Sequence, residues 1–268
     1  MLAGGESRRF GSDKAGAVVE GSTMLERAVR LVGEVADEVI LAGRESVSDL
    51  IRGVPDDASL PCGGPPRGVA SALGTANGDL IVVLPVDMPY LSRAQLSPLI
   101  EAAEKAGVSS VLLGGGSVAA NLLAARKKEL QDALRLACLK GRLGLKVRMT
   151  DMLRASGALL LGAGLLGGAA RFIDVDAPSD LSVRVRARGP LRSVRLSSSG
   201  NYARAIELLS SGDRRGAVME LSLEAESYRA DRLWLLEMHA LLDYSAVSGR
   251  KLARVSVLTA RLGRAKES

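Results

Sequence analysis

Two short stretches of the chain become continuously apolar after an acidic start: DEVILAG at residues 37–43 and DLIVVLP at residues 79–85. Neither stretch alternates between apolar and polar positions, which is typical of a strand that is covered on both faces of a sheet. The pattern therefore predicts two strands of a parallel sheet with helices packed on both sides.

Helical signals lie before the first predicted strand and after the second. Residues 23–36 carry an apolar stripe behind Thr23, and Glu26 stands three residues after this threonine, as in a capping box. Residues 92–107 begin with serine and end with glycine, the usual start and stop signals of a helix. The alternation favours an α/β fold with a doubly wound, mostly parallel, Rossmann-like sheet, whose ligands bind at the carboxyl ends of the strands.

Two longer uncharged stretches, residues 107–125 and 155–170, are the segments that a membrane protein would place in the bilayer. Glycine and polar residues interrupt the first stretch, and the second is too short to cross a bilayer comfortably. We expect both to be buried in the domain, and we expect no membrane partner.

The composition and the sequence pattern of the chain change after Leu181. Arginines then cluster around a Gly-Pro break, and nearly everything beyond Asn201 is helix-forming, with breaks at SSGD and YRAD. We expect an α/β domain over residues 1–188 and a small all-α module of unassigned role over residues 189–268. The arginines form either a solvated linker or a contact for an anionic partner: Arg184, Arg186, Arg188, Arg192 and Arg195.

The amino-acid composition limits the classes of ligand and the cellular compartment that we expect. The 268 residues include 36 Lys and Arg against 30 Asp and Glu, a modest excess that suits an anionic ligand without requiring nucleic acid. Cys62 and Cys138 have no CxxC partner, so neither a disulfide framework nor a zinc site is indicated, and a reducing cytoplasm is expected. Charged residues at positions 6, 8 and 9 exclude an ordinary secretory signal. Asn and Gln together number five, a scarcity typical of thermophilic proteins.

The chain opens with MLAGGESRRFGSDKA, in which glycine and positive charge are concentrated. Gly4 and Gly5 allow backbone N–H groups to approach a triphosphate closely, because no Cβ stands in the way. Arg9 and Lys14 carry the charge to neutralise phosphates. On the glycines alone, a tight turn with solvated charges around it is an equal alternative.

Asp87 follows the second apolar stretch, so its carboxylate is expected at the carboxyl edge of the sheet. A Mg²⁺ ion that bridges phosphates commonly takes one or two carboxylates together with phosphate oxygens and water. The alternative role is structural, with Asp87 capping the turn before Pro89.

The string LAGGxSxRxGxDK resembles the signature of the molybdenum cofactor guanylyltransferase family, within the sugar-phosphate nucleotidyltransferase fold. Phe10 stands where that family usually has methionine. The matching residues are Leu2, Ala3, Gly4, Gly5, Ser7, Arg9, Gly11, Asp13 and Lys14.

Three further segments resemble the family in the same order. GGPPRGVASAL at residues 63–73 is similar to a GPLAG segment of the nucleotide pocket. LPVDMPYL at residues 84–91 is similar to the segment CDMPFL, whose aspartate holds Mg²⁺. RFIDVDAPSDL at residues 171–181 is similar to the closing segment NxNTPEDL, with Asp174 and Asp176 replacing asparagines. The resemblance covers about residues 1–185.

The resemblance implies a Mg²⁺-dependent enzyme that transfers GMP from GTP to a phosphorylated small molecule, Mo-molybdopterin, and releases pyrophosphate. It implies Lys14, Arg9 and Asp87 as catalytic residues and Asp87 as the metal ligand. Asp174 and Asp176 either supply a second carboxylate or cap a helix near Ser179. The implied nucleotide-binding residues are Leu2, Ala3, Gly4, Gly5, Ser7, Lys14, Asp57, Gly64, Gly68 and Asp87.

The sequence departs from the family at two places. Only three residues precede Gly4, so either the coding start lies upstream or the first strand is very short, and the family's His-Pro segment is absent after residues 114–117. Two alternatives therefore stay open. One is another transferase, a cobinamide-phosphate guanylyltransferase or a cytidylyltransferase. The other is a non-catalytic nucleotide sensor whose helical tail binds a protein partner. His239, in that tail, is expected to be a surface or half-buried residue, and Cys62 a small packing residue.

Overall fold

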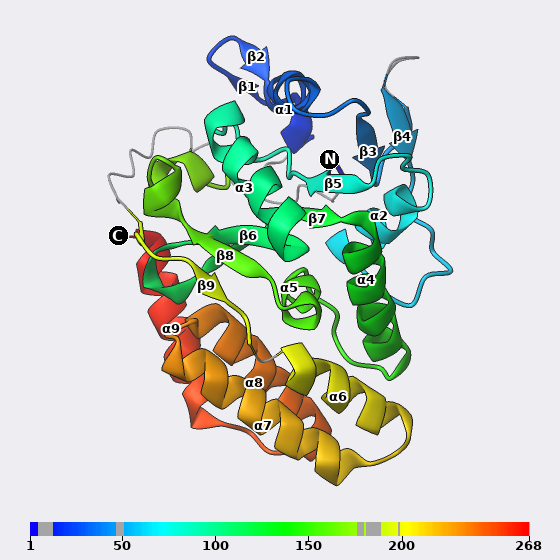
Figure 1. The fold of residues 1–268 in the computed structure, drawn as a ribbon, viewed down its shortest axis with the longest axis vertical. Helices are drawn as coiled ribbons and strands as arrows, with labels where there is room; N and C mark the ends of the chain where they lie inside the picture. The colour runs from blue at the N-terminus through cyan, green and yellow to red at the C-terminus, as the bar shows by residue number, and fades with distance from the viewer. Residues whose placement is uncertain (5–12, 47–50, 176–179, 181–188, 198, 268) are drawn as a thin grey trace.

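A computed structural model describes most of the chain (Figure 1). The described residues are 1–4, 13–46, 51–175, 180, 189–197 and 199–267. Within them, a mixed β-sheet lies between two layers of helices, and four further helices pack against one of these layers.

The sheet is built from short strands. Leu2 forms single parallel bridges to Ala42 and to Pro85, and so joins β3 to the end of β5. The order across the sheet is β4, β3, Leu2, β5, β7, β6, β8 and β9. The strands of this sheet are β3 (Ile40–Ala42), β4 (Arg52–Val54), β5 (Leu80–Val83), β6 (Val108–Leu112), β7 (Val118–Arg126), β8 (Leu159–Gly162) and β9 (Val194–Arg195). A separate hairpin pairs β1 (Val18–Val19) with β2 (Ser22–Thr23).

Most strands of the sheet run in one direction. β3 and β4 are parallel, as are β6 and β8, whereas β7 is antiparallel to both β5 and β6, and β9 is antiparallel to β8. Only β7 and β9 thus oppose the others among the described strands. The two predicted strands are confirmed as β3 and β5, each shorter than its apolar stretch. The stretches 107–125 and 155–170 contain β6, all but the last residue of β7, and β8, and the strand residues within them are buried or half-buried.

Two apolar cores lie on the two faces of the sheet. α1 and α3 cover one face, and α2, α4 and α5 cover the other. The bounds of these helices are α1 Met24–Gly33, α2 Pro65–Leu73, α3 Arg93–Ala106, α4 Lys127–Arg142 and α5 Thr150–Ser156. Short 3₁₀ turns lie in the connecting segments outside these helices: η1 Lys14–Gly16, η2 Gly114–Gly116, η3 Ala163–Leu166 and η4 Ala169–Phe172.

The predicted helix signals operate as expected. Glu26 N donates to Thr23 Oγ1 at 3.1 Å and Thr23 N donates to Glu26 Oε2 at 2.8 Å, which closes the capping box of α1. α3 ends at Gly107, whose φ of 87° lies in the region that glycine adopts without strain. No described helix combines the length and apolar character that a bilayer span requires.

The chain beyond residue 188 does not leave the sheet at once, because β9 pairs with β8. The expected boundary at residue 188 therefore falls inside the sheet region, and the helices begin at Ser199. They divide at SSGD and YRAD as predicted, with bounds α6 Ser199–Ser210, α7 Arg214–Ala230, α8 Trp234–Ser248 and α9 Ala253–Glu267. We call α6–α9 the helical tail. It packs below the sheet on the side of α4 and α5 (Figure 1), and Tyr228, Leu236 and Leu258 complete the apolar core of that face.

Five buried charged side chains and the half-buried Arg148 meet where the helical tail contacts the α/β layers. We call this set the junction cluster: Lys140, Arg148, Asp151, Arg154, Glu224 and Asp243. Arg154 binds Glu224 through Nε at 2.8 Å and Nη2 at 2.7 Å, and its guanidinium lies 4.5 Å from the ring centre of Tyr202. Lys140 Nζ lies 3.0 Å from Asp151 and 2.6 Å from Asp243. The helical tail supplies two of the three carboxylates, so the two parts of the chain share one buried ion network.

Candidate active site

The carboxyl ends of the central strands bring the first residues of the chain beside Asp87. Leu2 N donates to Leu84 O at 2.8 Å, and Val86 N donates back to Leu2 O at 3.2 Å. On the other side, Ala3 N donates to Ala42 O at 3.1 Å. These bonds place Gly4, Gly43 and the turn that contains Asp87 along one edge of the sheet.

Gly4 and Gly43 pack backbone against backbone. A Cβ on Gly4 would lie 3.0 Å from Gly43 Cα, and one on Gly43, which has φ of +81°, would lie 2.9 Å from Gly4 Cα. Any side chain at either position would force the two segments apart. Gly5, Ser7 and Arg9, predicted to bind the nucleotide or its phosphates, lie outside the described residues.

Lys14 reaches this edge from the 3₁₀ turn η1. Asp13 caps the turn by accepting a hydrogen bond from Ala15 N at 3.1 Å. The Lys14 ammonium then lies 2.8 Å from Asp87 Oδ2, across 73 positions of sequence. Both side chains remain partly accessible, at 14% and 23% of their full exposure. The structure thus brings together two residues that the sequence placed on separate motifs.

The two carboxylate oxygens of Asp87 differ in their contacts. Its Oδ1 is buried and accepts no hydrogen bond from any described residue. A buried carboxylate oxygen is costly without a partner, and a hard cation is a suitable one. Val175 N donates to Asp87 O at 2.9 Å, so Asp174, which is exposed, lies on the neighbouring segment. Asp176 lies outside the described residues. No described group of three or more His, Cys, Asp or Glu side chains forms a metal cage, but Mg²⁺ needs only one or two carboxylates beside phosphates.

The loop that leads into α2 and the first turns of α2 form a wall beside this edge, since a Cβ on Gly68 would lie 3.6 Å from Ala42 Cβ and 3.8 Å from Leu2 Cδ2. Gly64 precedes the helix with φ of 62°, and Pro65 and Pro66 occupy its first turn. Gly68 leaves room for a carboxylate, because a Cβ there would lie 3.2 Å from Asp56 Oδ1. The same oxygen lies 3.3 Å from the Cβ position of Gly43.

Asp57, the acidic residue that the family resemblance singled out, is turned to solvent. Its Oδ1 accepts hydrogen bonds from Ser59 N at 2.9 Å and from Ser59 Oγ at 2.6 Å. These bonds with Ser59 lower the pKa of Asp57. The carboxylate next to the glycines at the sheet edge is therefore that of Asp56.

Arg44 is a second residue that the motifs did not indicate. It directly follows Gly43 at the end of β3, and its guanidinium pairs with the Asp13 carboxylate. The hydrogen bond from Arg44 lowers the pKa of Asp13. The available signal was its position: a cation placed immediately after an apolar strand lies at the carboxyl edge of the sheet.

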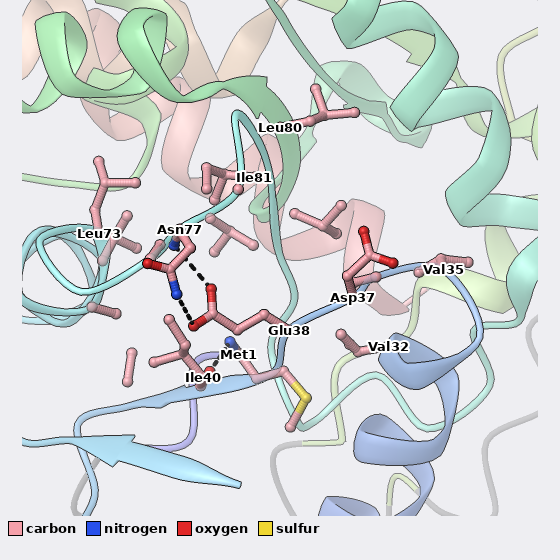
Figure 2. A pocket seen from close by; sticks show the side chains of 18 of the residues that line it. Met1, Val32, Val35, Asp37, Glu38, Ile40, Leu73, Asn77, Leu80 and Ile81 are labelled. Carbon is pink, nitrogen blue, oxygen red and sulfur yellow. Dashed lines mark hydrogen bonds between the residues drawn. The ribbon is translucent and has the colours of Figure 1, made fainter. Parts of the chain in front are cut away.

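A sizeable cavity lies elsewhere in the described part of the chain. About 740 Å³ in volume, it lies between the beginnings of β3 and β5 (Figure 2). The Met1 amino group donates to Ile40 O at 2.6 Å beside it, and burial lowers the pKa of this amine to about 6. Figure 2 shows Glu38 and Asn77 bound to each other at its rim. Its described lining is mainly apolar and contains no Lys or Arg, so it is not suited to a triphosphate.

The strand order, with a glycine turn, a lysine and an aspartate gathered at one carboxyl edge, defines the class: the chain has the α/β fold of nucleotidyltransferases. A family model described as the MobA-like NTP transferase domain matches residues 1–155. Because the match covers more than half of the chain, the chain belongs to this family. The matched part ends within α5, before the helical tail.

Individual relatives agree with this assignment. A probable molybdenum cofactor guanylyltransferase from Geobacillus sp. is 35% identical over 97 residues, 34% of this chain and 50% of the relative. A molybdenum cofactor guanylyltransferase from Shewanella amazonensis is 28% identical over 142 residues, 50% of this chain and 71% of the relative. The chain thus spans about half the length of the first relative.

A solved structure shares the fold. It is molybdopterin-guanine dinucleotide biosynthesis protein A from Archaeoglobus fulgidus, with a TM-score of 0.52 and 20% identity over 67% of this chain and 92% of that one. The family resemblance and the α/β fold class predicted from the sequence are confirmed.

Proposed function

We propose that this protein transfers GMP from GTP to a phosphorylated cofactor precursor, Mo-molybdopterin, with release of pyrophosphate. The observation that carries the proposal is the Lys14–Asp87 pair, which stands beside Gly4 at the carboxyl edge of the sheet. The names of the relatives, molybdenum cofactor guanylyltransferases, support both the guanine nucleotide and the acceptor.

The chemistry needs no nucleophile from the protein. The phosphate of the acceptor is already an anion at neutral pH and attacks the α-phosphorus of GTP in line, while pyrophosphate leaves. The work of the protein is to hold two highly charged reactants together and to offset their repulsion. Backbone amides of the glycine turn, with Lys14 and Arg9, provide donors and positive charge for this purpose.

Asp87 is the residue that would hold Mg²⁺, since its Oδ1 is buried without a described partner. When bound there, Mg²⁺ would supply positive charge to the triphosphate oxygens. In the structure the Lys14 ammonium occupies the other oxygen, Oδ2, and so keeps the carboxylate oriented toward the sheet edge. Asp174 and Asp176 remain candidates for a second carboxylate, and Gly64, Gly68, Asp56 and Asp57 for the nucleotide pocket.

The test is a matrix of reactions. The purified protein is incubated with Mg²⁺, each of the four common nucleoside triphosphates and either Mo-molybdopterin or cobinamide phosphate, and pyrophosphate is followed. We expect release only with GTP and Mo-molybdopterin together. If kcat/KM is higher with CTP than with GTP, or higher with cobinamide phosphate than with Mo-molybdopterin, the proposed substrate is wrong. Tight GTP binding with no pyrophosphate in any mixture would make the protein a nucleotide sensor instead.

A further inference from the structure

The two cysteines of the chain, 76 positions apart, meet between the loop before α2 and helix α4. Cys138 Sγ lies 2.9 Å from Cys62 Sγ, about 1 Å beyond the length of a disulfide bond. Cys62 has no exposed surface, while Cys138 is partly exposed. The sequence spacing gave no sign of this contact, because it depends on how α4 crosses the loop.

The loop is held against α4 by groups other than the sulfur atoms. Gly141 of α4 makes room for it, since a Cβ there would lie 2.3 Å from Pro61 O. Arg67 of α2 also binds the loop, with Nε donating to Cys62 O at 2.7 Å and Nη2 to Leu60 O at 3.3 Å. The backbone around Cys62 is therefore positioned before any bond between the sulfurs forms.

We propose that Cys62 and Cys138 form a thiol–disulfide site, whose oxidised form fastens the loop of residues 60–64 to α4. The reaction partner is a disulfide of low molecular weight. The more accessible Cys138 attacks one sulfur of that disulfide and displaces the first small thiol, which leaves a mixed disulfide on Cys138. Cys62 then attacks Cys138 Sγ and displaces the second small thiol.

Electrons, protons and bonds balance in this exchange. Two protein thiols lose two electrons and two protons, one S–S bond forms in the protein, and the external disulfide becomes two thiols. The order of the steps follows from the surroundings, because burial raises the pKa of the Cys62 thiol to about 12 and makes it a poor first nucleophile.

Two observations support a role for a disulfide bond between Cys62 and Cys138. The scarcity of Asn and Gln, five in 268 residues, is shared with thermophilic proteins, in which disulfides inside the cell persist. The fastened loop also leads directly into Gly64 and α2, and Gly68 of α2 packs beside Leu2 and Ala42 at the sheet edge. The link to nucleotide binding rests on the proposed function, so the test relies on covalent chemistry and thermal stability instead of turnover.

The full chain is oxidised with glutathione disulfide or reduced with dithiothreitol, digested, and mapped by mass spectrometry. We expect a peptide pair that joins Cys62 to Cys138 in the oxidised sample and two alkylated cysteines in the reduced one. Because the bond closes a long loop, Tm should be higher by about 5–15 °C in the oxidised protein.

Cys138→Ser is the control, because Cys138 is the more exposed partner and its substitution disturbs the packing least. In this variant the redox-dependent shift in Tm should disappear, while the reduced variant should melt within about 2 °C of the reduced wild type. Alkylation of both cysteines after oxidation, a disulfide between two copies of the chain, or an equal shift in Cys138→Ser would overturn the proposal.

Discussion

Lys14–Asp87 at the sheet edge and Lys140–Asp151 in the junction cluster pair the same two residue types in opposite surroundings. The first pair is partly accessible, and one oxygen of Asp87 has no described partner. The second pair has no exposed side-chain surface. Under the proposed function, the first pair is placed for a ligand, whereas the second pair holds the fold together.

The carboxylates of the junction cluster are fully paired and hydrogen-bonded. Its three carboxylates balance three cations, and all six carboxylate oxygens accept at least one hydrogen bond from a described group. A buried ion network of this kind tolerates no missing member, because each ion left behind is desolvated without compensation. At the sheet edge, by contrast, Asp87 Oδ1 has no described partner, and under the proposed function this oxygen would bind a cation.

The largest effect is expected from breaking the junction cluster. Arg154→Ala would leave Glu224 without its bidentate partner and remove a cation from Asp151 and Asp243. We expect the free energy of unfolding to fall by about 3–5 kcal/mol, measured by urea denaturation. Arg135→Ala, which removes an exposed arginine 3.7 Å from Asp132, should change it by less than about 0.5 kcal/mol. Equal effects of the two substitutions would contradict a structural role for the cluster.

Asp87→Asn tests the other side of the comparison. It keeps the size of the side chain but removes the charge that faces Lys14 and the proposed cation. We expect pyrophosphate release to fall by about 100-fold to 1000-fold, with Tm nearly unchanged. Asp151→Asn is the matched substitution in the junction cluster, and it should show the reverse pattern, with a large loss of stability. An Asp87→Asn protein with the wild-type rate would exclude Asp87 from the mechanism.

Much of the fold follows from local patterns in the sequence. The apolar stretches at residues 37–43 and 79–85, the cap at Thr23 and the stop at Gly107 act over a few residues, so the sequence displays them directly. The direction of β7 is different, because it depends on a hairpin through Gly114–Gly116 and not on apolar content. The place of β9 was missed for a related reason: two paired residues give too short a pattern to recognise.

The site was predictable where a motif carries it and unpredictable where packing creates it. Gly4, Lys14 and Asp87 belong to dense motifs, and the structure gathers them at one edge. The different surroundings of Asp56 and Asp57 depend on the turn at Ser59, whose N–H and hydroxyl bind the Asp57 carboxylate. The junction cluster joins α4 and α5 to α7 and α8, and only tertiary packing reveals that its charges are buried.

A smaller effect is expected from pH. His239 is half-buried, and its Nδ1 lies 2.7 Å from Thr150 Oγ1 beside the junction cluster. Burial, followed by the charges of Arg148 and Arg154, lowers the pKa of His239 to about 3. Below pH 6.5, His239 is therefore protonated in the unfolded chain but stays neutral in the folded chain. The free energy of unfolding consequently falls as the pH drops from 6.5 toward 3.

Urea denaturation at pH 7 and pH 4.5 measures this loss, which we expect to include about 2 kcal/mol from His239. In His239→Gln that part should vanish. The pKa of Asp243 is held low by Arg154 and Lys140 against the effect of burial, so its contribution is lost only at more acidic pH and should persist in the variant. Identical pH dependence of the two proteins would show that His239 titrates normally in the folded state.

The smallest effect distinguishes two neighbouring acids at the sheet edge. Both side chains are exposed, but Asp56 Oδ1 lies 3.3 Å and 3.2 Å from the positions that a Cβ would take on Gly43 and Gly68, whereas Asp57 Oδ1 accepts hydrogen bonds from Ser59. We expect Asp56→Asn to raise the KM for GTP about fivefold, since it weakens one charged hydrogen bond to the nucleotide, and Asp57→Asn to change KM less than twofold. The two substitutions are chemically identical and adjacent in the chain, so a general loss of charge would affect both. If Asp57→Asn has the larger effect, the nucleotide is held on the outer side of the loop, and the wall formed by Gly64 and Gly68 is not its binding surface.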